Sequence, residues 1–194
     1  MSQGNNTAEF WSGQFGDEYH RRNRVDWRKR IPFWKQIMEI TGARSVYEWG
    51  CGPGWNLSAI QSGSEWPAKV WGNEVNKSAA SQGIFAGLDI RLKDYGSEIG
   101  SEYELVFTAG ALIHVEPEYL NFRMNWLIER SCDYVLSIEY ESPEERMIPY
   151  RGENDKLWSR PYGKLYQDLG LKMVKQFNAG EGFDNCTASL LRLP

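Results

Sequence analysis

Three alternate glycines, Gly50, Gly52 and Gly54, stand between an apolar run and a helical pattern in the segment 46–55. Glycine adopts positive φ at little cost and has no Cβ, so such a turn lets a ligand approach the main chain closely. A glycine-rich turn between a strand and a helix can also be purely structural. The neighbouring residues therefore have to distinguish a binding loop from a simple connection.

Glu48 precedes these glycines and discriminates between ligands. A dinucleotide-binding turn has the spacing G-x-G-x-x-G and directs helix amides at a pyrophosphate, which a carboxylate at this position would repel. S-adenosylmethionine carries a sulfonium and an ammonium group and no phosphate, so the charge of Glu48 favours it over a nicotinamide dinucleotide. The loop predicts S-adenosylmethionine as the cofactor, and a nicotinamide oxidoreductase is the disfavoured alternative.

Two further acids end the next strand-like runs. Glu74 lies where a carboxylate can accept hydrogen bonds from both ribose hydroxyls, although an acid capping the next helix is the alternative. Asp94 could accept a hydrogen bond from an adenine amino group while Tyr95 covers the ring, and a surface turn is the alternative there. These residues extend the predicted donor site along the sheet edge.

The candidate catalytic residues follow the fourth and fifth runs. A hydroxyl acceptor must lose a proton, and imidazole titrates near neutral pH, so His114 is the candidate general base. A histidine hydrogen-bonded for structure at a helix start is the alternative. Glu139 and Tyr140 end the fifth run, at the edge where open α/β sheets bind ligands, and could orient the acceptor.

The segment 141–162 is long and polar for a connection between a strand and a helix. Long loops at this edge often determine substrate choice. Arg151 and Arg160 could bind a carboxylate or a phosphate, since the arginine fork matches such anions, and Trp158 adds an aromatic face. A solvated charged loop is the alternative.

Strand-length apolar runs alternate with helical windows from Arg44 onward, which predicts βαβ units and a mainly parallel sheet. A helical N-terminal segment is expected over residues 7–40, ended by Thr41-Gly42. The loop 179–182 is too short for a helical crossover, so the last two strands should form an antiparallel hairpin. The expected strands are 45–49, 69–74, 88–92, 104–109, 134–140, 172–178 and 187–193, and the expected helices are 55–62, 77–85, 117–130 and 159–169.

The succession of Glu48, the three glycines, Glu74 and the run 105–115 resembles class I S-adenosylmethionine-dependent methyltransferases. The resemblance implies a Rossmann-like sheet of seven strands in the order 3-2-1-4-5-7-6, with strand 7 antiparallel and helices on both faces. The resemblance covers residues 44–194, the expected Rossmann-like core. Together with a helical lid segment at 1–43, this core is expected to form a single domain over residues 1–194.

The same resemblance implies roles for lid and loop residues. Tyr19 and Asn23 would close over the donor, and the backbone at Gly50 and Ala109 would hold its methionine part. An aromatic residue such as Tyr19 could instead belong to the core.

A narrower similarity concerns the segment 10–23, the run 112–114 and the tripeptide 150–152, which look like the methylases associated with pseudaminic acid biosynthesis. This similarity suggests O-methylation of a sugar or a nonulosonic acid, as a free acid or in nucleotide-activated form. A nucleic-acid methyltransferase would usually carry an Asp/Asn-Pro-Pro-aromatic signature where this chain has the residues 108–111. A donor-binding protein without turnover is a further alternative, because binding and chemistry use different residues.

The composition of the chain disfavours several other classes of protein. The chain has 194 residues, 41% of them apolar, as expected for one domain, and a net charge of −4 that disfavours a nucleic-acid partner. Three scattered cysteines and two histidines indicate neither a disulfide framework nor a metal site. The chain lacks a signal-peptide pattern and a stretch near the roughly 18 apolar residues that span a membrane, so we expect a cytoplasmic protein.

Overall fold

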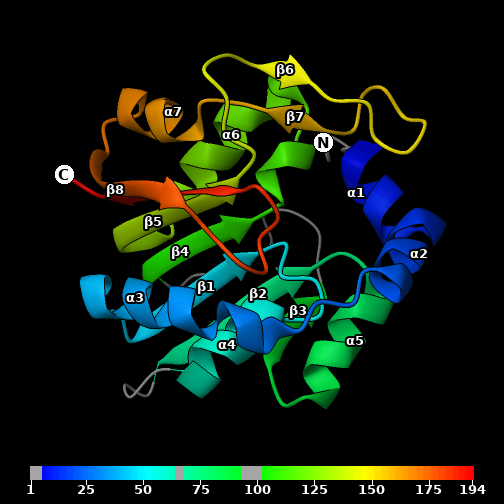
Figure 1. Cartoon of the computed structure of the whole chain (residues 1–194), viewed down its shortest axis with the longest axis horizontal. Helices are drawn as coiled ribbons and strands as arrows, with labels where there is room; N and C mark the ends of the chain where they lie inside the picture. The colour runs from blue at the N-terminus through cyan, green and yellow to red at the C-terminus, as the bar shows by residue number, and fades with distance from the viewer. Residues whose placement is uncertain (1–5, 64–67, 93–101) are drawn as a thin grey trace.

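A seven-stranded sheet forms the centre of the computed structural model, which describes residues 6–63, 68–92 and 102–194 (Figure 1). The strands follow the order β3-β2-β1-β4-β5-β9-β8, so the sixth and seventh strands of the sheet in chain order are β8 and β9. All neighbours from β3 to β5 pair in parallel, whereas β9 is antiparallel to both β5 and β8. This is the predicted order. The bounds are β1 Ser45–Trp49, β2 Lys69–Glu74, β3 Asp89–Leu92, β4 Tyr103–Ala109, β5 Ser131–Glu139, β8 Lys172–Asn178 and β9 Thr187–Arg192.

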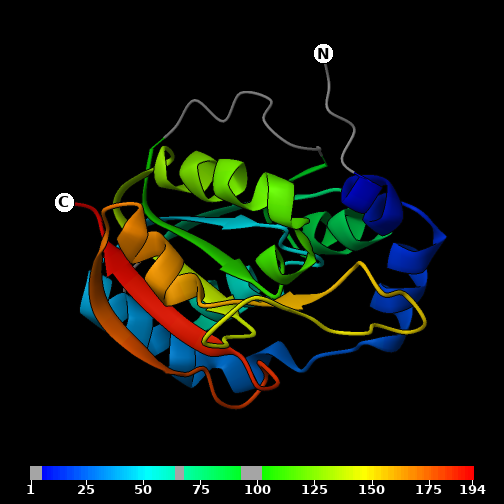
Figure 2. The same cartoon turned by 90° about the horizontal axis from the view of Figure 1, so that it is seen from above.

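Helices cover both faces of the sheet, which explains why its central strands are buried almost throughout (Figure 2). On one face the core contains side chains of α3 (Ile31–Thr41), α4 (Trp55–Gly63) and α5 (Lys77–Phe85). On the other face it contains side chains of α6 (Pro117–Ile128) and α7 (Tyr162–Asp168). At the edge, β8 alternates half-buried and exposed residues, as expected for a strand with one solvated face.

The N-terminal segment corrects one expectation, because residues 7–40 do not form continuous helix. The chain forms α1 (Asn6–Ser12), α2 (Gln14–Arg22) and the 3₁₀ turn η1 (Trp27–Arg30) before α3 begins. Residues 23–26 are not helical, and the Asp26 side chain accepts a hydrogen bond from the backbone N–H of Arg28 at 3.2 Å, which caps η1. Gly42 ends α3 at φ 63°, as predicted.

The connection between β5 and α7 is a ribbon rather than an irregular loop. It contains the two-residue strands β6 (Arg146–Met147) and β7 (Trp158–Ser159), which pair antiparallel. At its tip, Arg151 and Gly152 have φ of 52° and 90° between Tyr150 and Glu153, whose backbone groups bond to each other. Figures 1 and 2 show this tip beside α1 and α2. Because Ser159 belongs to the ribbon, α7 starts later than expected.

None of the helices in the described ranges is long and apolar enough to cross a lipid bilayer.

Candidate donor and acceptor site

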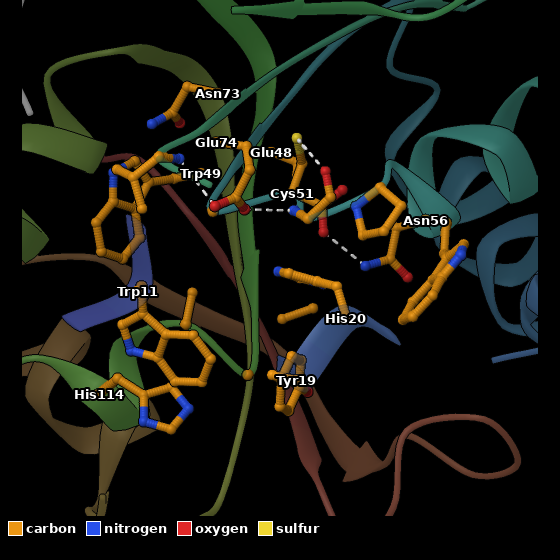
Figure 3. A pocket seen from close by; sticks show the side chains of 18 of the residues that line it. Trp11, Tyr19, His20, Glu48, Trp49, Cys51, Asn56, Asn73, Glu74 and His114 are labelled. Atoms are coloured by element: carbon orange, nitrogen blue, oxygen red, sulfur yellow. Dashed lines mark hydrogen bonds between the residues drawn. The ribbon is translucent and has the colours of Figure 1, made fainter. Parts of the chain in front are cut away.

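A cavity of about 160 Å³ lies where β1, β2 and β4 end, beneath α1 and α2 (Figure 3). This is the edge at which open α/β sheets bind ligands. Its wall combines the glycine loop, the ends of three strands and the N-terminal helices. The lining residues are Ala8, Trp11, Tyr19, His20, Arg30, Glu48, Trp49, Gly50, Cys51, Gly52, Pro53, Trp55, Asn56, Asn73, Glu74, Val75, Ala109, Gly110, Ala111 and His114.

The three glycines of the loop have different structural roles. Gly50 and Gly52 line the cavity at φ of 71° and 53°. Gly54, at φ 78°, is not among the lining residues, and a Cβ there would lie 2.3 Å from Leu88 Cδ1. Gly50 and Gly52 therefore stay candidates for donor contact, whereas Gly54 permits close packing of α4 against β3.

Glu48 is buried at the edge of the cavity, with 1% of its surface exposed. Its Oε1 accepts a hydrogen bond from Asn56 Nδ2 at 2.6 Å, and Oε2 accepts none from any residue that the structure describes. Asn56 Oδ1 in turn accepts hydrogen bonds from Arg30 at 2.9 Å and Trp34 at 3.2 Å. Burial raises the pKa of Glu48 to about 8, against the lowering effects of Asn56 and Arg30. A buried carboxyl without a partner on one oxygen fits a ligand that brings positive charge.

Glu74 joins the cavity to the loop. Its Oε2 accepts a hydrogen bond from Gly52 N at 2.7 Å, and its Oε1 accepts bonds from the backbone of Val75 and Asn76, both at 2.8 Å. Burial raises the pKa of Glu74, while these three bonds act to lower it. Asn76, rather than Glu74, caps α5 by accepting from Ala79 N. A carboxylate oxygen accepts more than one bond, so ribose hydroxyls could still bind here.

The N-terminal helices α1 and α2, which belong to the expected lid segment, contribute cavity residues that were not predicted from the sequence. Tyr19 lines the cavity and stays a candidate for donor contact, and burial raises its pKa to about 12. Trp11 and His20 line it as well, and His20 Nδ1 has no hydrogen-bond partner among residues 6–63, 68–92 and 102–194. Asn23, which was predicted to close over the donor, does not line the cavity; it is the C-cap residue of α2, and its backbone N–H bonds to the Tyr19 carbonyl.

The lid is attached to α5 through Asn76. While its Oδ1 caps the helix, its Nδ2 donates to Trp11 O at 3.1 Å and to Asp17 Oδ1 at 2.9 Å. Gly16 makes this approach possible, since a Cβ there would lie 2.8 Å from Asn76 Nδ2.

His114 reaches the cavity from the 3₁₀ turn η2 (Leu112–His114) and is 9% exposed. Its Nδ1 lies 2.6 Å from Lys156 O, and a carbonyl can only accept, so Nδ1 carries the proton and Nε2 is the basic nitrogen. Burial lowers the pKa of His114 to about 4. Its ring centroid lies 4.5 Å from that of Trp11, and Figure 3 shows the two rings side by side.

Glu139 and Tyr140 are placed differently from the expectation. Glu139 is fully buried, does not line the cavity, and accepts backbone hydrogen bonds from Ala111, Leu112 and Ile113. The expectation that it orients the acceptor directly is therefore corrected. Tyr140 is half-buried outside the lining, and burial raises its pKa to about 12.

The three predicted substrate-binding residues on the ribbon lie in different environments. Arg160 is 1% exposed and donates to the carbonyls of Leu112 and Val115, so it is an internal residue rather than a substrate ligand at the surface. Trp158 is buried with the Arg160 guanidinium 5.0 Å from its ring. Arg151 is exposed at the tip, 5.8 Å from the Tyr150 ring. Asp94 and Tyr95 lie outside the described residues.

Metal ligands are not gathered anywhere in the part of the chain that the structure describes: no group of three or more His, Cys, Asp or Glu side chains could hold an ion.

The sheet order, the antiparallel β9 and the cavity at the strand ends define a fold shared with class I methyltransferases. Magnesium protoporphyrin IX methyltransferase from Synechocystis PCC 6803, solved with bound SAH, aligns over 96% of this chain and 98% of its own at 13% identity, with a TM-score of 0.70. The Burkholderia thailandensis 1,6-didemethyltoxoflavin-N1-methyltransferase, solved with its substrate and S-adenosylhomocysteine, aligns over 96% and 88% at 15% identity, with a TM-score of 0.74.

A sugar N-methyltransferase from Streptoalloteichus sp. aligns over 94% of both chains at 12% identity, with a TM-score of 0.68. No protein-family model and no curated protein matches the sequence. At such low identities the likeness establishes the fold, and the function has to be argued from the site.

Proposed function

We propose that this protein is an S-adenosylmethionine-dependent methyltransferase acting on a small molecule. The observation that carries the proposal is the buried Glu48, whose Oε2 is unpartnered among the described residues and borders a cavity under a glycine loop. The solved neighbours with bound SAM or SAH support the same donor for this chain.

The lining residues fit the parts of this donor. Glu74 would accept hydrogen bonds from the ribose hydroxyls, and the backbone at Gly50, Gly52 and Ala109 would lie along the methionine part. Glu48 would face the ammonium and sulfonium charges.

Arg30 completes this donor site. Among the described lining residues it is the only Lys or Arg, and it can pair with the donor carboxylate. When bound, S-adenosylmethionine supplies an electrophilic methyl group on its sulfur.

The side chains at the other end of the cavity serve the acceptor. Trp11 and Tyr19 shield this end from water, which strengthens the electrostatic interactions inside it. His114 Nε2 accepts the proton of an acceptor hydroxyl as the new carbon–oxygen bond forms and the methyl–sulfur bond breaks. Because an oxygen that is being alkylated becomes strongly acidic, a base with a pKa of about 4 is sufficient.

For the acceptor we favour a sugar or a nonulosonic acid, free or nucleotide-activated. Arg151 is exposed at the ribbon tip, and Tyr150 beside it lies 6.0 Å from Phe15 of the lid, ring to ring. An arginine next to aromatic rings suits an acceptor that combines a carboxylate or phosphate with apolar ring faces.

Calorimetry tests the donor first. We expect S-adenosylmethionine and S-adenosylhomocysteine to bind the purified protein and NAD not to bind. Glu48→Gln should weaken donor binding, whereas Glu129→Gln, an exposed acid at the end of α6, should not. A folded protein that binds neither donor nor product contradicts the proposal.

Turnover tests the acceptor. Labelled donor is incubated with nonulosonic acids, their nucleotide-activated forms, neutral sugars and unrelated hydroxylated metabolites, and a methyl gain is detected by mass. Methylation of acidic sugars that falls in Arg151→Ala supports the acceptor proposal. Transfer only to unrelated metabolites removes the sugar assignment and retains the methyltransferase, and donor binding without any transfer indicates a protein that binds without turnover.

A further inference from the structure

The turn η2, which presents His114, is held on two sides by buried charged groups. On one side Glu139 Oε1 accepts from the backbone N–H of Ala111 at 3.3 Å and of Leu112 at 3.2 Å, and Oε2 accepts from Ile113 N at 3.3 Å. A turn this short leaves most of its backbone groups without partners of its own, so an external carboxylate can satisfy them.

On the other side, Arg160 binds the carbonyls of the same turn. Its two terminal nitrogens donate to Leu112 O at 3.2 Å and to Val115 O at 2.8 Å. Glu139 is 0% and Arg160 is 1% exposed, and burying such charges is costly unless they are well hydrogen-bonded. The turn supplies those bonds, so its position and the burial of both charges depend on each other.

The same ribbon determines which nitrogen of His114 carries the proton. Arg160 follows β7, its Nε donates to Glu145 Oε2 at 2.6 Å, and its backbone N–H bonds to the Tyr140 carbonyl. Lys156, four residues earlier in the ribbon, provides the carbonyl that accepts the Nδ1 proton of His114. The ribbon thus holds the turn through Arg160 and the imidazole through Lys156.

From these contacts we infer that Glu139 and Arg160 are positioning residues for His114, and that the ribbon of residues 141–161 keeps its imidazole in the Nδ1–H tautomer. This inference rests on the proposed role of His114 as the base. If the turn moves away from Lys156, the proton is free to relocate to Nε2. An Nε2–H group donates a hydrogen bond and cannot accept the proton of an acceptor.

The tautomer can be measured directly, because the chain has only two histidines. In ¹⁵N NMR spectra of the full chain, His20→Gln assigns the remaining imidazole signals to His114. We expect the Nδ1–H pattern in the wild type at neutral pH. An Nε2–H pattern in the wild type overturns the inference without any further variant.

Two variants then test the positioning. Arg160→Lys keeps the charge but cannot reach both carbonyls, and Glu139→Gln keeps the shape but loses one acceptor oxygen. Each should increase the Nε2–H signal of His114 and lower kcat by roughly 10²-fold, with a much smaller change in the KM for the donor. Arg192→Lys is the matched control, since Arg192 also binds a carboxylate through Nε but is exposed and distant from the turn.

Thermal unfolding accompanies these measurements and separates the outcomes. A folded variant with a lower Tm, an unchanged tautomer and an unchanged kcat overturns the inference and leaves a purely structural role. If both variants fail to fold, the wild-type tautomer still decides whether the ribbon holds the imidazole in the Nδ1–H form. Failure of the wild type to bind the donor refutes the proposed function instead, and the tautomer measurement does not depend on that result.

Discussion

The affinity for the donor should rise with pH, because Glu48 must lose its proton when a cation binds beside it. In the protein alone, burial raises the pKa of Glu48 from 4.5 to about 8, so the side chain is mostly neutral at pH 7. A cation within about 4–6 Å favours the charged carboxylate and lowers this pKa.

The direction and the size of this pH dependence follow from the linkage between donor binding and proton release. Between the lower pKa of the complex and about 8, binding the donor releases up to one proton, so the dissociation constant falls by as much as about tenfold per pH unit. Above about pH 8 this contribution levels off, since Glu48 is already ionised in the free protein.

Calorimetry at several pH values, in two buffers of different ionisation enthalpy, measures both the affinity and the protons released. Glu48→Gln provides the reference, because it retains any titration of the donor itself. Glu139 also titrates in this range, with a pKa raised to about 7 by burial, so Glu139→Gln is run beside it. His20 and His114, with pKa values lowered to about 4, stay neutral from pH 6 to 8.

We expect the wild type and Glu139→Gln to release more protons on binding than the Glu48→Gln reference does. Equal pH dependence in the wild type and in Glu48→Gln would refute the proposed contact between Glu48 and the donor.

Three further outcomes are expected. Gly54→Ala should lower the free energy of unfolding by roughly 2–5 kcal/mol in denaturant titrations, because φ is 78° and a Cβ would lie 2.3 Å from Leu88 Cδ1. The control Gly87→Ala, at φ 85° in open space, should lower the free energy of unfolding by only about 1–2 kcal/mol. Asn56→Ala should lower it by about 1–3 kcal/mol, since the three side chains that bond to Asn56 lose that partner, and full stability would contradict the network. His114→Asn should lower kcat by roughly 10²–10⁴-fold while donor binding by calorimetry stays within about twofold, and undiminished turnover removes His114 from the mechanism.

The sheet was predictable because its central strands are buried on both faces and contain apolar segments of strand length. The expected bounds of β1, β2, β8 and α5 agree with the structure, and the strand order is confirmed. The N-terminal helix was predicted as one piece because aromatic residues recur at helical spacing on either side of residues 23–26, a periodicity that does not reveal the break.

The site was only partly predictable. Glu48 and the cavity-lining glycines share one short loop, so their proximity follows from the sequence. Trp11, His20 and Arg30 reach the cavity from the N-terminal segment, and no local pattern specifies where that segment packs. The spacing of eight residues between Glu48 and Asn56 was an available signal, because it places an amide in the first turn of the helix after the loop.

Arg160 was predicted to bind the substrate, but it lies inside the protein. A charged residue in a polar segment suggests exposure, but it points inward to the carbonyls of another turn. The carbonyls that Arg160 binds come close to it only in the folded chain, so the sequence does not reveal this role.

Asn76 uses separate atoms of one amide for two tasks: its oxygen caps α5 and its nitrogen holds the N-terminal helices. Swinging those helices outward breaks the two bonds from the nitrogen and leaves the helix cap intact. An acceptor could therefore enter without unfolding the start of α5. Asn76→Asp would retain the helix cap and lose the two bonds that hold the N-terminal helices. Such a variant would show whether acceptor binding depends on the attachment of the N-terminal helices to α5.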